Sequence, residues 1–300
     1  ARYVRLNPKM RISNLRLKGK EMENQTFSLT CIVDSFSFPV NDNTFSFKNI
    51  NLNSAVECNR VQYDLNWKNP ESVSLLPSQL SGMVQFSNLS HYILQFYNES
   101  ELAIKNYRWH FNDENQIQIK KDRIEFDNLL LSADKSSLKL DGTFSQKENL
   151  PLKIDITNVD LSILNSFFDN KSINLGGDIS SEFNFSVEKG KNILNGKALI
   201  SDFVFNETKF GNIFVLATLP TQNDVRFVGG IYTSENSINS ADITNYSYAS
   251  FEKEKGKIAF LNGGYDIKNK QFAVYTNVSS LDVGFLQPFL SSFRDRKSVV

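Results

Sequence analysis

Alternation of apolar and polar residues with a period of two dominates the chain. In residues 123–131, Ile124 and Phe126 alternate with charged residues, and Leu138 and Leu140 repeat the pattern soon afterwards. Successive side chains of a β-strand point to opposite faces, so this spacing predicts strands with one apolar and one polar face. Helical spacing is scarce. We therefore expect an all-β chain, an elongated, curled and mainly antiparallel sheet with an apolar interior.

The alternation slips by one residue at two places. Phe47 is followed by Ile50 and Leu52 on the apolar phase, and Phe126 is followed by Leu129. An extra residue in one strand, a β-bulge, produces such a slip. Polar breaks at residues 133–137, 146–149, 188–192 and 267–270 have the length of hairpin turns. The sequence thus predicts consecutive strands joined as antiparallel neighbours.

Two segments have the spacing of one or two helical turns, residues 161–168 and 281–290. Each follows a strand and an Asn-Val step, which suggests a repeated unit around residues 138–168 and 258–290. The alternative is two unrelated hairpins of similar composition. We treat residues 1–293 as one continuous segment, with a loop or weak boundary at 69–82, and leave 294–300 unassigned.

Composition and charge argue against several classes of function. Lys+Arg and Asp+Glu both number 33, so the chain lacks the basic excess of a dedicated nucleic-acid binder. Two cysteines and two histidines nearly exclude a Cys/His zinc site. No run approaches the roughly 20 apolar residues that span a bilayer, so we expect any membrane anchor to lie outside this segment.

No catalytic constellation emerges from the motifs. A Gly-x-Ser-x-Gly elbow is absent, and His91 and His110 stand in contexts typical of structural residues. The pairs at 229–230 and 263–264 are isolated glycines within strands, which indicates bulges or tight turns rather than phosphate loops. We expect no enzyme, no cofactor and no metal site.

The remaining polar candidates have plain structural roles. Asp122, Glu125 and Asp127 alternate on the wet face of one strand, where solvation is the expected role. Cys31 and Cys58 form either one disulfide in an oxidising compartment or two free thiols.

The apolar face itself is the remaining candidate site. Strands with one apolar side must cover it, by pairing two sheets, by closing a barrel or by curling into a trough that holds something apolar. The candidate lining residues of a trough lie at apolar positions of several strands: Phe45, Phe47, Ile124, Phe126, Leu129, Leu131, Leu138, Leu140, Phe144, Leu152, Ile154, Ile156, Phe183, Phe185, Phe272 and Val274.

Several runs resemble the middle of TamB proteins, the translocation and assembly module, and their AsmA-like relatives. They are residues 106–117 (NYRWHFNDENQI), 124–131 (IEFDNLLL), 138–145 (LKLDGTFS), 175–180 (LGGDIS), 194–200 (LNGKALI) and 280–290 (SLDVGFLQPFL). The resemblance covers roughly residues 1–293 and rests on spacing and glycine turns. It implies a β-groove lined with apolar side chains in the periplasm. It also implies a tether to the inner membrane through a segment outside this chain.

The resemblance further implies a lipid conduit, with phospholipid as the bound partner. The family is associated with carrying phospholipid towards the outer membrane and with outer-membrane protein assembly. It is also associated with a barrel partner of the BamA or TamA type, reached through a C-terminal region absent here. The alternatives are a structural or adhesive β-sandwich at the cell surface and, less in keeping with the irregular strand spacing, a transmembrane barrel.

Overall fold

The protein is described by a computed structural model that covers residues 11–13, 15–22, 26–40, 43–71, 73–88, 90–145, 147–167, 174–188, 191–221, 224–232, 257–269 and 271–278. The chain divides into two compact units, Ala1–Thr157 with Asn184–Gly190, and Asn158–Phe183 with Lys191–Val300. The two units are described separately below.

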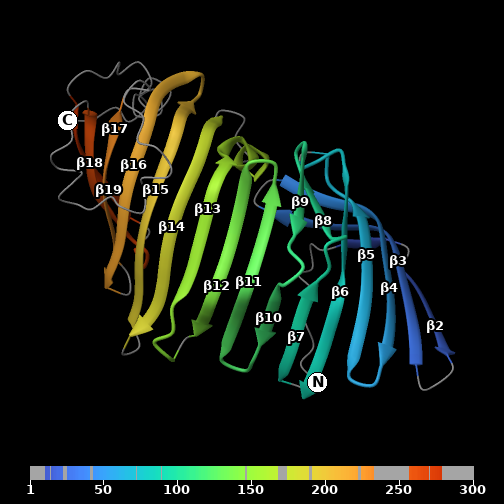
Figure 1. Ribbon diagram of the computed structural model, residues 1–300. Helices are drawn as coiled ribbons and strands as arrows, with labels where there is room; N and C mark the ends of the chain where they lie inside the picture. Colours follow the sequence, from blue (N-terminus) through green and yellow to red (C-terminus); the bar gives the residue numbers. More distant parts are fainter. Residues whose placement is uncertain are drawn as a thin grey trace, which may run out of the picture. The chain divides into compact units, whose positions relative to one another are not determined.

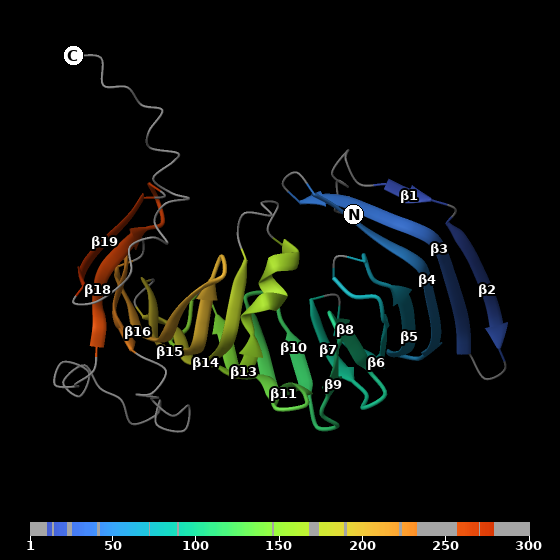
Figure 2. The ribbon, with the colours of Figure 1, turned by 90° about the horizontal axis from the view of Figure 1, so that it is seen from above.

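Unit 1 contains thirteen described strands, of which the last ends in unit 2 (Figure 1). They are β1 (Arg11–Ser13), β2 (Arg16–Met22), β3 (Thr26–Val40), β4 (Asn43–Glu57), β5 (Arg60–Lys68), β6 (Pro77–Asn88), β7 (His91–Phe96), β8 (Glu101–Ile104), β9 (Tyr107–Phe111), β10 (Gln116–Ile119), β11 (Arg123–Ala133), β12 (Ser136–Ser145) and β13 (Leu152–Asp160). Seen from above, the sheet of this unit bends from β2 and β3 through β5 and β6 to β11 (Figure 2).

Unit 2 contains one short 3₁₀ helix and the remaining strands. They are η1 (Leu161–Phe167), β14 (Leu175–Glu188, whose last five residues belong to unit 1), β15 (Lys191–Phe205), β16 (Thr208–Thr221), β17 (Asp224–Tyr232), β18 (Lys257–Asp266) and β19 (Gln271–Val278). The helical turn predicted at 161–168 is therefore confirmed. The turn predicted at 281–290 lies outside the described residues, as do residues 294–300.

Every strand pair whose register is described is antiparallel, and most join neighbours in the sequence. The breaks at 133–137, 146–149 and 267–270 connect β11 to β12, β12 to β13 and β18 to β19. The prediction of an all-β chain built from a curled antiparallel sheet with very short helical turns is confirmed. The stretch at 69–82 consists of a loop followed by the first half of β6.

Both slips of the alternation are β-bulges. Asn49 has a φ of 52°, and the register of β4 against β5 shifts between Lys48 and Asn51. Asn128 has a φ of 51°, and β11 shifts against β12 between Phe126 and Leu129. Asparagine is one of the few residues with a side chain that adopts this left-handed conformation readily. The predicted bulges are therefore confirmed.

The paired glycines at 229–230 and 263–264 do not form bulges or turns, which corrects that expectation. Both pairs lie in regular antiparallel ladder between β17 and β18. A Cβ on Gly263 would lie 2.6 Å from the ring of Phe227, its cross-strand partner. Gly82 lies under Tyr63 in the same way, and a Cβ there would approach the Tyr63 hydroxyl to 2.6 Å. Gly263 and Gly82 thus make room for an aromatic ring as well as for the carbonyl oxygen of a neighbouring strand, a use that alternation alone does not predict.

Strands β7 to β10 contain two facing interruptions. β7 and β8 both pair with β6, and β9 and β10 both pair with β11, but residues 97–100 and 112–115 leave the ladder. Fully buried Ser100 fills the first gap: it accepts a hydrogen bond from Ser81 N–H at 2.9 Å and donates one to Ser81 C=O at 2.8 Å.

Asn115 and Asn112 fill the second gap with their side-chain amides. Asn115, 1% exposed, accepts from Phe96 N–H at 2.9 Å and donates to Phe96 C=O at 2.8 Å. Asn112 accepts from Leu130 N–H at 3.1 Å and donates to Asn128 C=O at 2.9 Å. Each amide thus replaces one residue of a β-ladder, which keeps the backbone groups satisfied where the strands are broken.

In unit 2, apolar residues lie on both faces of the sheet. Leu199, Phe214 and Tyr232 form one buried cluster, while Ile231 and Ala259 belong to another. Ile231 and Tyr232 are consecutive in β17 and so point to opposite faces. The one-sided pattern therefore describes unit 1 better than unit 2.

Candidate functional site: the apolar face of unit 1

The apolar face of unit 1 is built on cross-strand registers. One row runs through nine strands from β13 to β3, because each residue pairs directly with the next: Leu152, Gly142, Phe126, Ile117, Leu94, Val84, Val61, Val56 and Phe27. Directly paired residues share a face of the sheet. With strands about 4.8 Å apart, eight steps give an apolar strip of about 38 Å measured along the sheet.

The adjacent row, on the opposite face, is polar. It runs from β3 to β12 through Thr26, Glu57, Arg60, Gln85, Ile93, Gln118, Glu125 and Thr143, in which Ile93 is the sole apolar residue. Except at Ile93 in β7, a one-residue step from the apolar row to this row exchanges an apolar position for a polar one. This contrast defines two chemically distinct faces.

Much of the apolar face is accessible. Leu17, Phe27 and Phe86 are 64%, 43% and 42% exposed, and most members of the nine-strand row are half-buried. No helix occurs among the described residues of unit 1, whose strands are joined by the pairings given above. Within that described part, no second layer covers the face.

Most predicted lining residues share this face. Leu138 pairs with Leu131 and Ile156, and Leu140 pairs with Leu129 and Ile154, so three neighbouring strands present one surface. Ile124 pairs with Phe144 on the same side of β12. From Leu138 to Phe144 the surface is about 20 Å wide along the strand, at about 3.3 Å per residue.

The predicted phenylalanines occupy several places. The ring of Phe185 stacks on that of Phe144 at 5.4 Å, which adds β14 to this surface of unit 1. Phe45, buried in β4, stacks on Phe38, and Phe47 stacks on Phe38 as well. Phe183 belongs to unit 2, where its ring lies against Gly196. Phe272 and Val274 lie in β19, but their side chains are outside the described part of the structure.

Sequence reasoning missed the centre of the face. Ile117, Leu94, Val84 and Val61 were not among the predicted lining residues, yet they connect β11 to β4. β7 and β10 have only six and four residues, too few for a clear alternation. The signal that was present is a pair of valines, Val61 near the start of β5 and Val84 in the second half of β6, each next to a polar residue.

Glu125 is not simply solvated, which corrects the sequence expectation. Its carboxylate accepts hydrogen bonds from Lys120 Nζ at 2.8 Å and lies 2.7 Å from Arg123 Nε. The hydrogen bond from Lys120 is the main cause that lowers the pKa of Glu125, and Arg123 adds to it. Asp122 pairs with Lys147 at 3.2 Å, and this contact lowers the pKa of Asp122. The polar side of β10 to β12 thus carries an ion-pair network.

The two histidines and the two cysteines are the chain's candidates for acid–base and thiol chemistry. His110 lies 3.7 Å from Glu101, which also pairs with Arg108, and His91 begins β7 with its Nε2 unpaired. Cys31 and Cys58 are free thiols in the structure. Within the same residues no cluster of three metal-binding side chains occurs, and none of the helices has the length and hydrophobicity to cross a bilayer.

Fold and surface together define a class for unit 1: an antiparallel β-sheet with one polar face and one accessible apolar face. No known protein family, curated protein or solved structure matches the chain. The functional argument therefore depends on the face itself.

Proposed function

We propose that the chain is a periplasmic lipid-conduit segment of a TamB-like protein. In this proposal it carries phospholipid acyl chains between the inner and outer membranes and supports outer-membrane biogenesis and protein assembly. The observation that carries the proposal is the nine-strand apolar row, which remains accessible in unit 1. An exposed contiguous apolar surface of this extent is typical of a binding surface.

The energetics fit an acyl chain as the ligand. Exposing a methylene to water costs about 0.8 kcal/mol, so a 16-carbon tail in water is unfavourable by on the order of 12 kcal/mol. A strip without polar interruptions removes this penalty equally at every step along it. A lipid can then move along the strip without any catalytic residue.

The experiment is site-specific photo-crosslinking in cells. A photoreactive residue is placed singly at Phe126, Leu140 or Ile154, or at Phe185, in the complete protein, and adducts are identified by mass spectrometry. The matched control position is Asp127, which is exposed on the polar face of β11, next to Phe126. Glu125 is a poorer control because of its ion pairs.

Phospholipid adducts at the four apolar positions, with none at Asp127, are the expected result. Phe126→Asp should abolish adducts at Leu140 and Ile154, because an unpaired charge is strongly unfavourable next to acyl chains. Equal labelling of both faces, or absence of lipid at all four positions in folded protein, would favour the structural or adhesive β-sandwich instead.

A further inference from the structure

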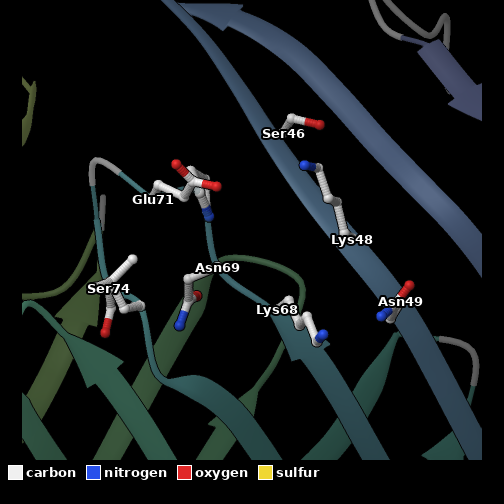
Figure 3. A pocket seen from close by; sticks show the side chains of 9 residues that line it. Ser46, Lys48, Asn49, Lys68, Asn69, Glu71 and Ser74 are labelled. Atoms are coloured by element: carbon white, nitrogen blue, oxygen red, sulfur yellow. The ribbon is translucent and has the colours of Figure 1, made fainter.

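A polar hollow lies at the end of β5, beside the loop that leads to β6 (Figure 3). Its volume is about 580 Å³. Strand β4 contributes Ser46, Lys48 and Asn49, and β5 ends there with Lys68. The following loop supplies the opposite wall, including Glu71.

The two lysines are held next to each other by the sheet. Lys48 and Lys68 are direct cross-strand partners and both are exposed. Like charges placed directly opposite each other are unfavourable in an antiparallel pair. Among the described residues neither ammonium group has a carboxylate within ion-pair distance, Glu71 included. Two lysines and one glutamate leave the hollow with a formal charge of +1.

The loop wall is fixed in place by hydrogen bonds. Asn69 Nδ2 donates to Leu76 C=O at 2.9 Å and to Ser78 Oγ at 2.8 Å, and Ser74 Oγ donates to Lys105 C=O at 2.6 Å. Ser74 is buried. Because the loop is held at both ends, the hollow is formed before any ligand arrives, and binding need not order the loop.

Lys48 and Lys68, which line the hollow, lie on the polar face of the sheet. Trp67, one residue before Lys68, pairs with Ser78 and points to the opposite side of β5, the side of Leu65 and Val61. A ligand whose chains lie on that apolar side must therefore pass around the end of β5 to place a polar end in the hollow.

We propose that Lys48 and Lys68 bind a phosphate oxyanion in this hollow. The argument for phosphate binding depends only on the lysine pair. The argument that the phosphate belongs to a phospholipid headgroup rests on the proposed function. Ammonium groups are common ligands of phosphate and act as point charges. The polar groups of Ser46 and Asn49 lie within the same hollow and can donate further hydrogen bonds.

The test measures binding of three probes to the protein by ³¹P NMR titration: inorganic phosphate, glycerol 3-phosphate and monomeric dihexanoylphosphatidylglycerol. The variant Lys48→Gln/Lys68→Gln is compared with Lys18→Gln/Lys20→Gln, which removes the same charge from exposed positions of β2. Lys48→Arg/Lys68→Arg keeps the charge and guards against a folding defect. Far-UV circular dichroism checks the fold of each variant.

The expected result is a dissociation constant raised roughly tenfold or more by the glutamine pair at residues 48 and 68, because a hydrogen bond to a charged group is lost at each lysine. The control pair should bind as the unaltered protein does, and the arginine pair should retain binding. Tighter binding of the short-chain lipid than of glycerol 3-phosphate identifies a headgroup as the source, and equal binding identifies free phosphate.

Binding that is unaffected at Lys48 and Lys68, or lowered equally in the control pair, overturns the proposal. Crosslinking at Phe126 in the glutamine variant separates the two hypotheses. If lipid adducts persist there while no probe binds through the lysines, the lipid conduit stands and the phosphate site fails. If the lysines bind phosphate but no adduct forms in any variant, the conduit fails.

Discussion

Asn115 is the side chain on which the broken part of the sheet depends most directly. Asn115→Leu keeps a similar volume but leaves Phe96 N–H and C=O without their ladder partner. Each buried backbone group left unsatisfied costs about 1–3 kcal/mol, so with two such groups we expect unit 1 to lose about 2–6 kcal/mol of its free energy of unfolding. Against a typical total of about 5–15 kcal/mol, this is a large loss.

Asn115→Asp gives a sharper form of the same prediction. The ionised carboxylate faces the carbonyl oxygens of Phe96 and Asn112, which the amide now satisfies. Burial of the carboxyl against two carbonyl oxygens raises its pKa, although Phe96 N–H can still donate to it. The protonated form, which can donate to Phe96 C=O, is therefore favoured. A raised carboxyl pKa makes the folded state less stable as pH rises. The loss of stability should therefore be larger at pH 7 than at pH 4.

Tryptophan fluorescence during urea unfolding measures both effects. The chain has two tryptophans, and both Trp67 and Trp109 lie in unit 1, so the signal reports on the relevant part. Asn98→Leu, at an exposed position of the other interruption (residues 97–100), is the control and should change stability by less than about 0.5 kcal/mol. The reasoning fails if Asn115→Leu unfolds at the urea concentration of this control, or if Asn115→Asp shows no dependence on pH.

Three further outcomes are expected. Glu125→Gln should make the stability fall less steeply as the pH is lowered below 4.5. The lowered pKa of the Glu125 carboxyl stabilises the fold above its ordinary pKa of 4.5, and this contribution is lost as the pH falls. Acid unfolding of the variant and of the unaltered protein measures the difference. Gly196→Ala should lower the melting temperature, since its Cβ would lie 2.0 Å from the ring of Phe183, and Phe183→Ala should restore much of the loss in a double-mutant cycle. Replacing His91 and His110 with alanine should leave lipid crosslinking unchanged, and a loss in folded protein would reveal a site that the structure does not indicate.

The strands were predictable because burial on one side imposes a local pattern. Ile124 and Phe126 show this alternation in β11, and the bulge at Asn128 can be recognised in the sequence because the alternation shifts by one residue there. The interruptions at 97–100 and 112–115 were not predictable. Ser100 and Asn115 are polar residues in turn-like sequence, and only the meeting of strands far apart in the chain buries them.

The same limit applies to the candidate sites. Alternation marks which side chains share a face within one strand, but registers decide which rows become continuous. Lys48 and Lys68 are 20 residues apart and belong to strands whose relative shift depends on the bulge at Asn49. No local pattern of charge predicts that pairing.

The bulge at Asn128 makes the number of residues in β11 as important as their identity. It takes up one residue, so that Leu129 and Leu131 lie on the side of Phe126 despite their odd spacing. Deleting Asn128 would remove the extra residue and leave Phe126, Leu129 and Leu131 in strict alternation with Asp127 and Leu130, so the apolar side chains would keep their side of the sheet. Deleting a residue from the regular part of the strand, such as Leu130, would instead turn Leu131 to the polar side and Ser132 to the apolar side, because a shift by one residue reverses every side chain that follows. The bulge is therefore a position at which β11 can lose a residue without exchanging its two faces.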